Sequence, residues 1–211
     1  MEVPPEFVAR QLDAVLSDAH VDAAKTGMLL TSGIVEVVTQ KIREYEIRNL
    51  VVDPVMISTS GTALLNPDAI ATLRRMLLPL ALLITPNTDE AQMLTGKKIE
   101  NLEDMEEAAL RIHETGARSV LIKGGHMTGN DAIDVLFDGS DFMHLRRGRI
   151  GSRPTHGTGC VLSAAITAGL AAGKSLSEAV HAAKDFVTAA IAHALTPGKG
   201  TGICDPLALE N

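Results

Sequence analysis

The stretch Leu82-Leu83-Ile84-Thr85-Pro86-Asn87-Thr88-Asp89-Glu90 joins a short apolar run to a polar one through a proline. The apolar run predicts a buried strand, the proline ends it, and the polar residues after it are typical of a helix start. The same change occurs where residues 50–52 meet Asp53-Pro54 and where residues 119–122 meet Lys123-Gly124-Gly125. Short strands that alternate with amphipathic segments predict an α/β fold, in which helices cover a mostly parallel sheet.

The rest of the chain fits this alternation. An opening helix is expected because Phe7, Val8, Leu12, Val15 and Leu16 recur at helical spacing. The other expected elements are a strand at residues 23–29, helices at residues 31–45, 66–78, 104–114, 159–172 and 175–195, an antiparallel edge hairpin at residues 133–137 and 142–146, and a loop at residues 197–202. No repeat or change in composition divides the sequence, so we expect residues 1–211 to form a single domain.

The composition excludes several classes of protein and partner. Of the 211 residues 45% are hydrophobic and 21% charged, which is typical of a globular protein and excludes a disordered one. The net charge of −7 argues against a nucleic acid or an acidic membrane bound by overall charge, and four Phe, one Tyr and no Trp offer little surface for stacking bases. The sequence contains neither a signal-peptide pattern nor an apolar run of about 18 residues. Cys160 and Cys204 do not make a disulfide framework, so we expect a cytoplasmic protein.

Three successive strand ends carry polar residues, and in an open parallel sheet ligands bind outside the carboxyl ends of the strands. We therefore expect Asp53, Glu90 and Lys123 to lie at one site. The spacing of Asn87 and Glu90 fits either a helix capping box or a carboxylate directed at a hydrated magnesium ion. Lys123 either holds a phosphate as a point charge or is a solvated lysine beside a glycine turn, and Asp53 alone could close a turn.

The segment Pro154-Thr155-His156-Gly157-Thr158-Gly159-Cys160 leads directly into an apolar helix. Glycines and a hydroxyl at a helix start present free N–H groups and the positive end of the helix dipole to an anion. The spacing differs from that of a P-loop, so this is a different phosphate-binding element. A thiol at a helix start loses its proton more readily, which suits a base or nucleophile, although Cys160 could also be a small buried hydrophobe. Cys204 is expected to be incidental.

Four motifs occur together in the order and spacing of one known family. They are Asp53-Pro54-Val55-Met56, Thr85-Pro86-Asn87-Thr88-Asp89-Glu90-Ala91, Lys123-Gly124-Gly125-His126 and His156-Gly157-Thr158-Gly159-Cys160. Over essentially its whole length the chain resembles the hydroxymethylpyrimidine/phosphomethylpyrimidine kinases of thiamine synthesis, in the ribokinase-like superfamily. The resemblance implies a three-layer α/β/α fold with a mostly parallel central sheet and an edge hairpin. The Gly-Thr-Gly-Cys element also resembles hydroxyethylthiazole kinase, whereas the second and third motifs are closer to the pyrimidine kinases or their pyridoxal-kinase relatives.

The resemblance also implies an activity: ATP-dependent phosphorylation of 4-amino-5-hydroxymethyl-2-methylpyrimidine, and then of its monophosphate to the diphosphate. The residue roles that it implies are a catalytic base at Cys160, an anion hole formed by Gly157, Thr158 and Gly159, ATP contacts from Lys123, Asn87 and Thr158, magnesium organised by Glu90 and Asp53, and a pyrimidine pocket lined by Met28 and Val55. Met28 read on its own is expected to be a core residue, with lining of an apolar pocket as the alternative.

The start of the chain departs from the family, whose members begin with a strand, a glycine-rich loop, a helix and another strand. Here the sequence begins directly before the helix that follows them, so we expect an N-terminally shortened domain that lacks at least a βαβ unit of roughly 30 residues or more and has an open sheet edge. Either the start is misplaced, the chain is a fragment, or the protein is a degenerate relative. The alternatives are a pyridoxal-type kinase or a nucleotide-binding and assembly domain without turnover. An open edge favours pairing, and superfamily relatives assemble, so we expect a homo-oligomer, with a dimer favoured.

Overall fold

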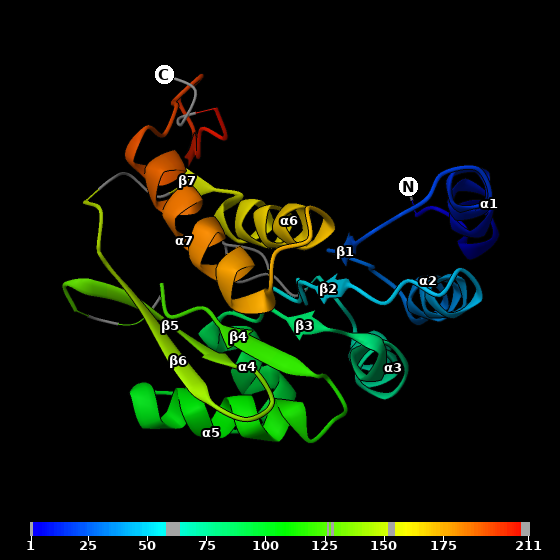
Figure 1. The fold of residues 1–211 in the computed structure, drawn as a ribbon, viewed down its shortest axis with the longest axis horizontal. Coiled ribbons are helices and arrows are strands. Elements are labelled where there is room, and N and C mark those ends of the chain that lie inside the picture. The colour runs from blue at the N-terminus through cyan, green and yellow to red at the C-terminus, as the bar shows by residue number, and fades with distance from the viewer. Residues whose placement is uncertain (1, 58–63, 126, 128, 152–154, 208–211) are drawn as a thin grey trace.

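The central sheet has the predicted architecture. In the computed structural model, which describes residues 2–57, 64–125, 127, 129–151 and 155–207, six strands form one sheet in chain order. They are β1 (Ala24–Thr26), β2 (Leu50–Val52), β3 (Leu83–Ile84), β4 (Ser119–Ile122), β5 (Asp131–Phe137) and β6 (Phe142–Gly148). The first four are parallel, and β5 and β6 form the antiparallel edge hairpin (Figure 1). The mostly parallel sheet with an edge hairpin is therefore confirmed.

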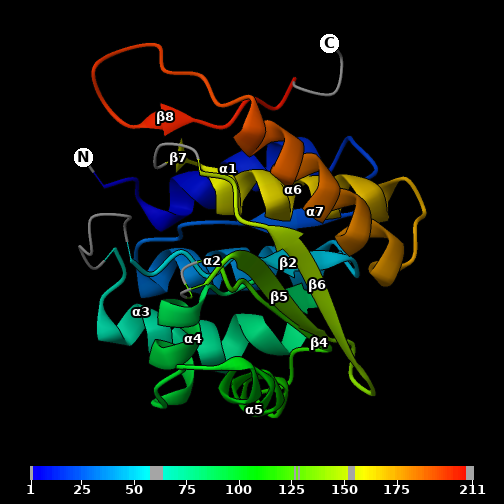
Figure 2. The same ribbon diagram turned by 90° about the vertical axis from the view of Figure 1, so that its left-hand side faces the viewer.

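Helices cover both faces of this sheet, as Figure 2 shows. One face carries α1 (Pro5–Leu16), α2 (Ser32–Glu44), α3 (Pro67–Thr72), α4 (Thr88–Thr95) and α5 (Leu102–His113), and the other carries α6 (Thr158–Ala171) and α7 (Leu176–Ala192). Strand side chains alternate between two apolar cores: Val51, Leu83 and Leu121 pack toward α6 and α7, whereas Val52 and Ile84 pack toward the other helices. The three expected layers follow from this alternation.

Most elements begin where the sequence predicts. The hydroxyl of Thr31 accepts a hydrogen bond from the N–H of Ile34 at the start of α2, and β2 and β4 have the predicted bounds. The helix expected at residues 66–78 differs: α3 is followed by a π-helical turn, η1 (Leu73–Leu77), and a 3-10 turn, η2 (Leu78–Leu80). Pro79 has no N–H to donate, so a regular α-helix does not continue through it.

The first helix lies on the surface of the fold. None of its residues is buried, and Phe7 and Val15 are 44% and 56% exposed. Its polar link to α2 is Asp13, which accepts hydrogen bonds from the Lys41 ammonium at 2.6 Å and the Tyr45 hydroxyl at 2.9 Å. The carboxylate of Asp13 raises the pKa of both Lys41 and Tyr45. Helix α1 is therefore attached by one side and presents apolar side chains to solvent on the other.

One expectation near the N-terminus is wrong. The strand expected at residues 23–29 ends at Thr26, so Met28 lies in the following loop and is 52% exposed rather than part of the core. The loop expected at residues 197–202 is confirmed through Thr201, whereas Gly202 begins β8 (Gly202–Ile203), which pairs in parallel with β7 (Thr155–His156). Among the described residues, no helix has the length and apolar character needed to cross a membrane.

Candidate active site

The ammonium of Lys123 lies at the meeting point of three segments. Its Nζ is 2.9 Å from Oδ1 of Asp53 and 3.9 Å from Oε2 of Glu90, and the carboxylates follow β2 and β3. It also approaches α6 so closely that a Cβ placed on Gly159 would be 3.1 Å from it. The predicted convergence of the three strand ends is therefore confirmed, and the start of α6 joins them.

Asp53 is the most buried member of this group, with 1% of its surface exposed. Besides Lys123, its carboxylate accepts hydrogen bonds from the hydroxyls of Thr85 and Ser163, both at 3.2 Å. Ser163 is on α6, so this contact ties the helix to the end of β2. Neither hydroxyl was expected at the site from the sequence, although Thr85 directly follows a predicted strand and Ser163 is a polar residue in an apolar helix.

Glu90 caps α4 and also faces Lys123. Its side chain accepts the N–H of Asn87 at 2.8 Å, and the Asn87 side chain accepts the N–H of Glu90 at 2.8 Å, so the capping box is present. Burial raises the pKa of Glu90, while the ammonium of Lys123 opposes this shift. The capping box does not remove Glu90 from the site, because its carboxylate is still within 3.9 Å of the lysine.

The start of α6 presents its backbone to the same place. Gly157 adopts a left-handed conformation with φ of 85°, and the N–H of Val161 makes the first helical bond, to the carbonyl of Gly157 at 2.8 Å. The N–H groups of residues 157–160 precede this bond and have no partner within the helix. The thiol of Cys160 is exposed in the same turn. This arrangement can hold an anion beside a cation and a thiol.

Cys204, which was expected to be incidental to the chemistry, has a structural contact. Its side chain is buried, and its thiol donates a hydrogen bond to the carbonyl of His156 at 3.6 Å. Together with the pairing of β7 and β8, this contact connects the tail to the loop before α6. Burial raises the pKa of Cys204, so its thiol keeps its proton. Of the two cysteines, only Cys160 is both exposed and at the helix start.

Met28 and Val55 are linked to the group through the backbone. The N–H of Asp53 donates to the carbonyl of Thr26, two residues before Met28, and the N–H of Val55 donates to the carbonyl of Asp53. Both residues therefore flank the carboxyl ends of β1 and β2. His126 and Pro154, which belong to the motifs discussed above, lie outside the described residues.

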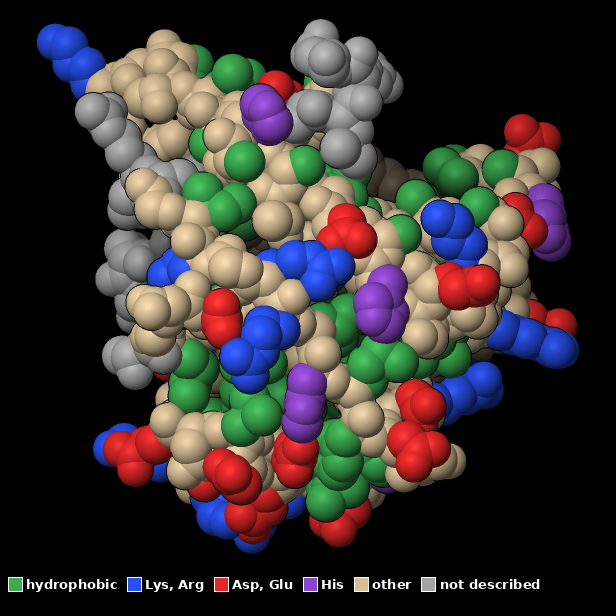
Figure 3. Space-filling view, turned by 60° about the vertical axis from the view of Figure 1, so that its left-hand side comes forward, with side chains coloured by type: hydrophobic (Ala, Val, Ile, Leu, Met, Phe, Trp, Pro, Cys, Tyr) green, Lys and Arg blue, Asp and Glu red, His purple; other side chains and the backbone are tan. Residues whose placement is uncertain are grey.

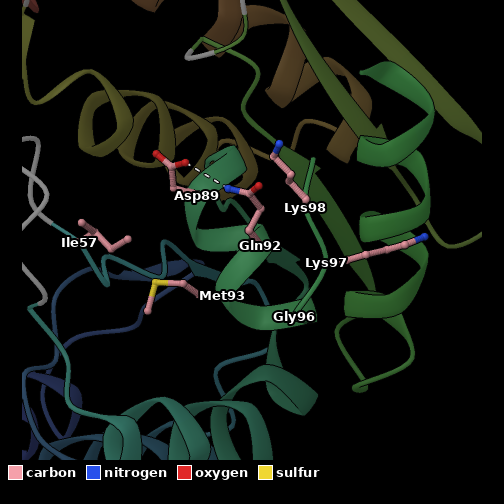
Figure 4. Close-up of a pocket in the computed structure, with 7 residues that line it drawn as sticks. All are labelled: Ile57, Asp89, Gln92, Met93, Gly96, Lys97 and Lys98. Atoms are coloured by element: carbon pink, nitrogen blue, oxygen red, sulfur yellow. Dashed lines mark hydrogen bonds between the residues drawn. The ribbon is translucent and has the colours of Figure 1, made fainter. Parts of the chain in front are cut away.

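A separate groove lies on the outer side of α4 (Figure 4). It has a volume of about 460 Å³ and is lined by Ile57, Asp89, Gln92, Met93, Gly96, Lys97 and Lys98. The α4 residues in this lining recur at helical spacing on the side away from the buried Glu90. The groove is therefore distinct from the Lys123 site.

Among the described residues, the surface of the molecule has no large region of a single charge on the face shown in Figure 3, where acidic and basic side chains are interspersed.

Comparison with known proteins identifies close relatives. The family model described as phosphomethylpyrimidine kinase matches residues 1–205. A bifunctional thiamine biosynthesis protein of Geobacter sulfurreducens is 49% identical over 200 residues, which are 95% of this chain and 41% of that protein. A hydroxymethylpyrimidine/phosphomethylpyrimidine kinase of Rhizobium meliloti is 50% identical over 204 residues, which are 95% of this chain and 76% of that enzyme. The chain thus spans less than half of the bifunctional relative.

A solved structure extends the comparison to three dimensions. The ADP complex of a Bacillus subtilis pyridoxal kinase superposes with a TM-score of 0.94 at 40% sequence identity. The superposition covers 100% of this chain and 79% of the kinase. The fold described above is therefore the fold of a nucleotide-binding kinase.

Proposed function

The chain belongs to the phosphomethylpyrimidine kinase family, and from this premise we propose that it transfers the γ-phosphoryl group of ATP to 4-amino-5-hydroxymethyl-2-methylpyrimidine and then to its monophosphate. The observation that carries the proposal is the position of the Lys123 ammonium between Asp53, Glu90 and the start of α6. Phosphoryl transfer depends on positioning and on charge stabilisation, and this arrangement can supply both. The product of the second transfer is the pyrimidine diphosphate.

The chain's cationic and backbone groups bind the phosphates. Lys123 contacts them as a point charge, with Asn87 and Thr158 as further ATP contacts. The N–H groups of residues 157–159 form the anion hole for the transferring phosphoryl group, where charge develops on its oxygens. Gly159 leaves space for the lysine ammonium, because a larger side chain would push against it.

Cys160 is the base for the acceptor hydroxyl. Its thiolate takes the proton of the hydroxymethyl group while the oxygen of that group forms a bond to the γ-phosphorus of ATP. The bond from the γ-phosphorus to the bridging oxygen breaks, and ADP leaves with that electron pair. Met28 and Val55 line the pocket that holds the pyrimidine ring beside the thiol.

The carboxylates of Asp53 and Glu90 fit a magnesium ion. Magnesium takes one or two protein carboxylates and otherwise keeps waters and phosphate oxygens, so the two carboxylates gathered around one ammonium are an adequate donor set. The ion would neutralise charge on the phosphate oxygens.

The acceptor is tested by measuring ADP release with hydroxymethylpyrimidine, with its monophosphate and with pyridoxal. We expect turnover with both pyrimidines. The close superposition on a pyridoxal kinase favours pyridoxal as the second candidate acceptor. Faster turnover with pyridoxal than with the pyrimidines would make pyridoxal the preferred acceptor. Nucleotide binding by calorimetry without turnover of any acceptor would make the chain a binding or assembly domain.

We also propose that the chain is one cytoplasmic domain that forms a homodimer. Both apolar cores share one sheet, which supports a single domain, and Cys160 and Cys204 are free thiols, which fits a reducing compartment. The edge strand β1 and the exposed Met28 offer a surface for pairing. Light scattering after gel filtration tests the dimer, and a monomer at micromolar concentration would exclude it.

A further inference from the structure

A buried ion pair lies beside the loop that follows Lys123. Asp134 of β5 and Lys184 of α7 are 4% and 6% exposed, and the Lys184 ammonium donates to Oδ2 of Asp134 at 2.6 Å. Its other oxygen, Oδ1, accepts the N–H of Gly124 at 3.0 Å. Neither residue belongs to a motif discussed above. The pair therefore connects α7 to the residue that directly follows Lys123.

Burying two charges is costly, and apolar residues of similar size often serve stability as well or better. The carboxylate of Asp134 also accepts a backbone N–H, so we infer that the pair serves to position that backbone. Here it holds the point where the chain leaves β4. The last β4–β5 register pair is Ile122 with Val135, and two residues after Ile122 the N–H of Gly124 bonds to the side chain of Asp134.

The backbone around Lys123 is held from two sides. The N–H of Lys123 donates to the carbonyl of Pro86 at 2.8 Å, beyond the end of β3. On the other side Gly124 lies so close to β5 that a Cβ would be 1.9 Å from the carbonyl oxygen of Ile133. The carboxylate of Asp134 fixes Gly124 in this tight space. Together these contacts determine where the Lys123 side chain starts.

We propose that Asp134 is a positioning residue for Lys123, and that Lys184 is the counter-charge that keeps Asp134 oriented toward the N–H of Gly124. The assignment rests on the proposed function, in which Lys123 contacts the phosphates of ATP. Helix α7, which lies beside the hairpin in Figure 2, thereby contributes to nucleotide binding without touching the nucleotide.

Two double variants separate positioning from burial of charge. Asp134→Asn with Lys184→Met removes both charges but keeps an oxygen that accepts from Gly124, whereas Asp134→Leu with Lys184→Met removes the acceptor as well. Both avoid leaving one buried charge unpaired. Val180→Ala, one turn before Lys184, is the control for disturbed packing of α7. If the leucine variant does not fold, Asp134→Ser with Lys184→Met replaces it, because the shorter hydroxyl does not reach Gly124.

The measurements are KM for ATP and kcat, with the Kd for ADP from calorimetry as a readout independent of turnover. We expect the variant without the acceptor to raise KM and Kd about tenfold, and the asparagine variant and Val180→Ala to stay within about twofold of wild type. Equal changes in the two double variants would overturn the proposal. If the proposed function is wrong, wild type will bind ADP but will not phosphorylate the pyrimidine. The Kd values for ADP then still test whether Asp134 positions Lys123.

Discussion

Gly159→Ala separates the stability of α6 from its use at the site. The added Cβ would lie 3.1 Å from Nζ of Lys123, closer than an ordinary contact of 3.4 to 4 Å, so the ammonium has to move by a few tenths of an ångström. That ammonium also donates to Asp53 at 2.9 Å. A hydrogen bond to a charged group contributes about 1.5–3 kcal/mol, and partial loss corresponds to a decrease of about five- to tenfold in kcat/KM for ATP.

The helix itself gains from the same substitution. Alanine is favoured over glycine in helices by up to about 1 kcal/mol, which offsets part of the weakened Lys123–Asp53 hydrogen bond, so Tm should change little. The assay is steady-state ADP release at varied ATP, with thermal unfolding of the same samples. Gly148→Ala is the matched control, because a Cβ there meets nothing within 4 Å, and it should leave both quantities unchanged. A folded Gly159→Ala protein with wild-type kcat/KM would refute the assigned contact between Lys123 and the phosphates.

Three other substitutions test separate parts of the account. Burial raises the pKa of Glu90 above its value in the unfolded chain, so the stability that Glu90 contributes is present at low pH and is lost as pH rises. In urea unfolding, Glu90→Gln should therefore become more stable relative to wild type as pH rises from about 4 to about 7. A difference in free energy of unfolding that does not change with pH would contradict this. Gly124→Ala should lower the free energy of unfolding by about 1–3 kcal/mol or more because of the carbonyl of Ile133, whereas Gly125→Ala should change it by less than about 0.5 kcal/mol. Cys160→Ala should lower kcat at least about a hundredfold with little change in Tm, because the exposed thiol is the proposed base. Cys204→Ala should lower Tm and leave most of kcat, because the buried thiol packs the tail. The reverse pattern would contradict the roles assigned to the two cysteines.

The strand ends could be predicted from the sequence because each is marked locally. Apolar runs define β2, β3 and β4, and a proline or a pair of glycines ends each run. The topology of a parallel sheet then brings the following residues together. Asp53, Glu90 and Lys123 could thus be grouped before any coordinates were known. The capping box at Asn87 was also visible in its spacing, although spacing alone did not show that Glu90 faces the lysine as well.

The remaining partners depend on packing between distant elements. Ser163 reaches Asp53, and Lys184 reaches Asp134, only because α6 and α7 lie over particular strands. The sequence of a helix does not show which strand residues it will pack against. The pairing of β7 with β8 could not be predicted because each strand has two residues, too short for a periodic pattern, and the sequence around Cys204 does not indicate that its side chain is buried. Met28 was misplaced because apolar residues continue past the end of β1.

Labelled phosphate shows whether the chain phosphorylates the pyrimidine and whether Cys160 is needed for it. The chain is incubated with magnesium, hydroxymethylpyrimidine and ATP that carries ³²P in its γ-phosphoryl group, and the products are separated over time for wild type and for Cys160→Ala. We expect label to appear first in the pyrimidine monophosphate and then in the diphosphate, and both products to be nearly absent in the variant. Label released only as inorganic phosphate, or equal transfer by the variant, would contradict phosphoryl transfer with Cys160 as the base.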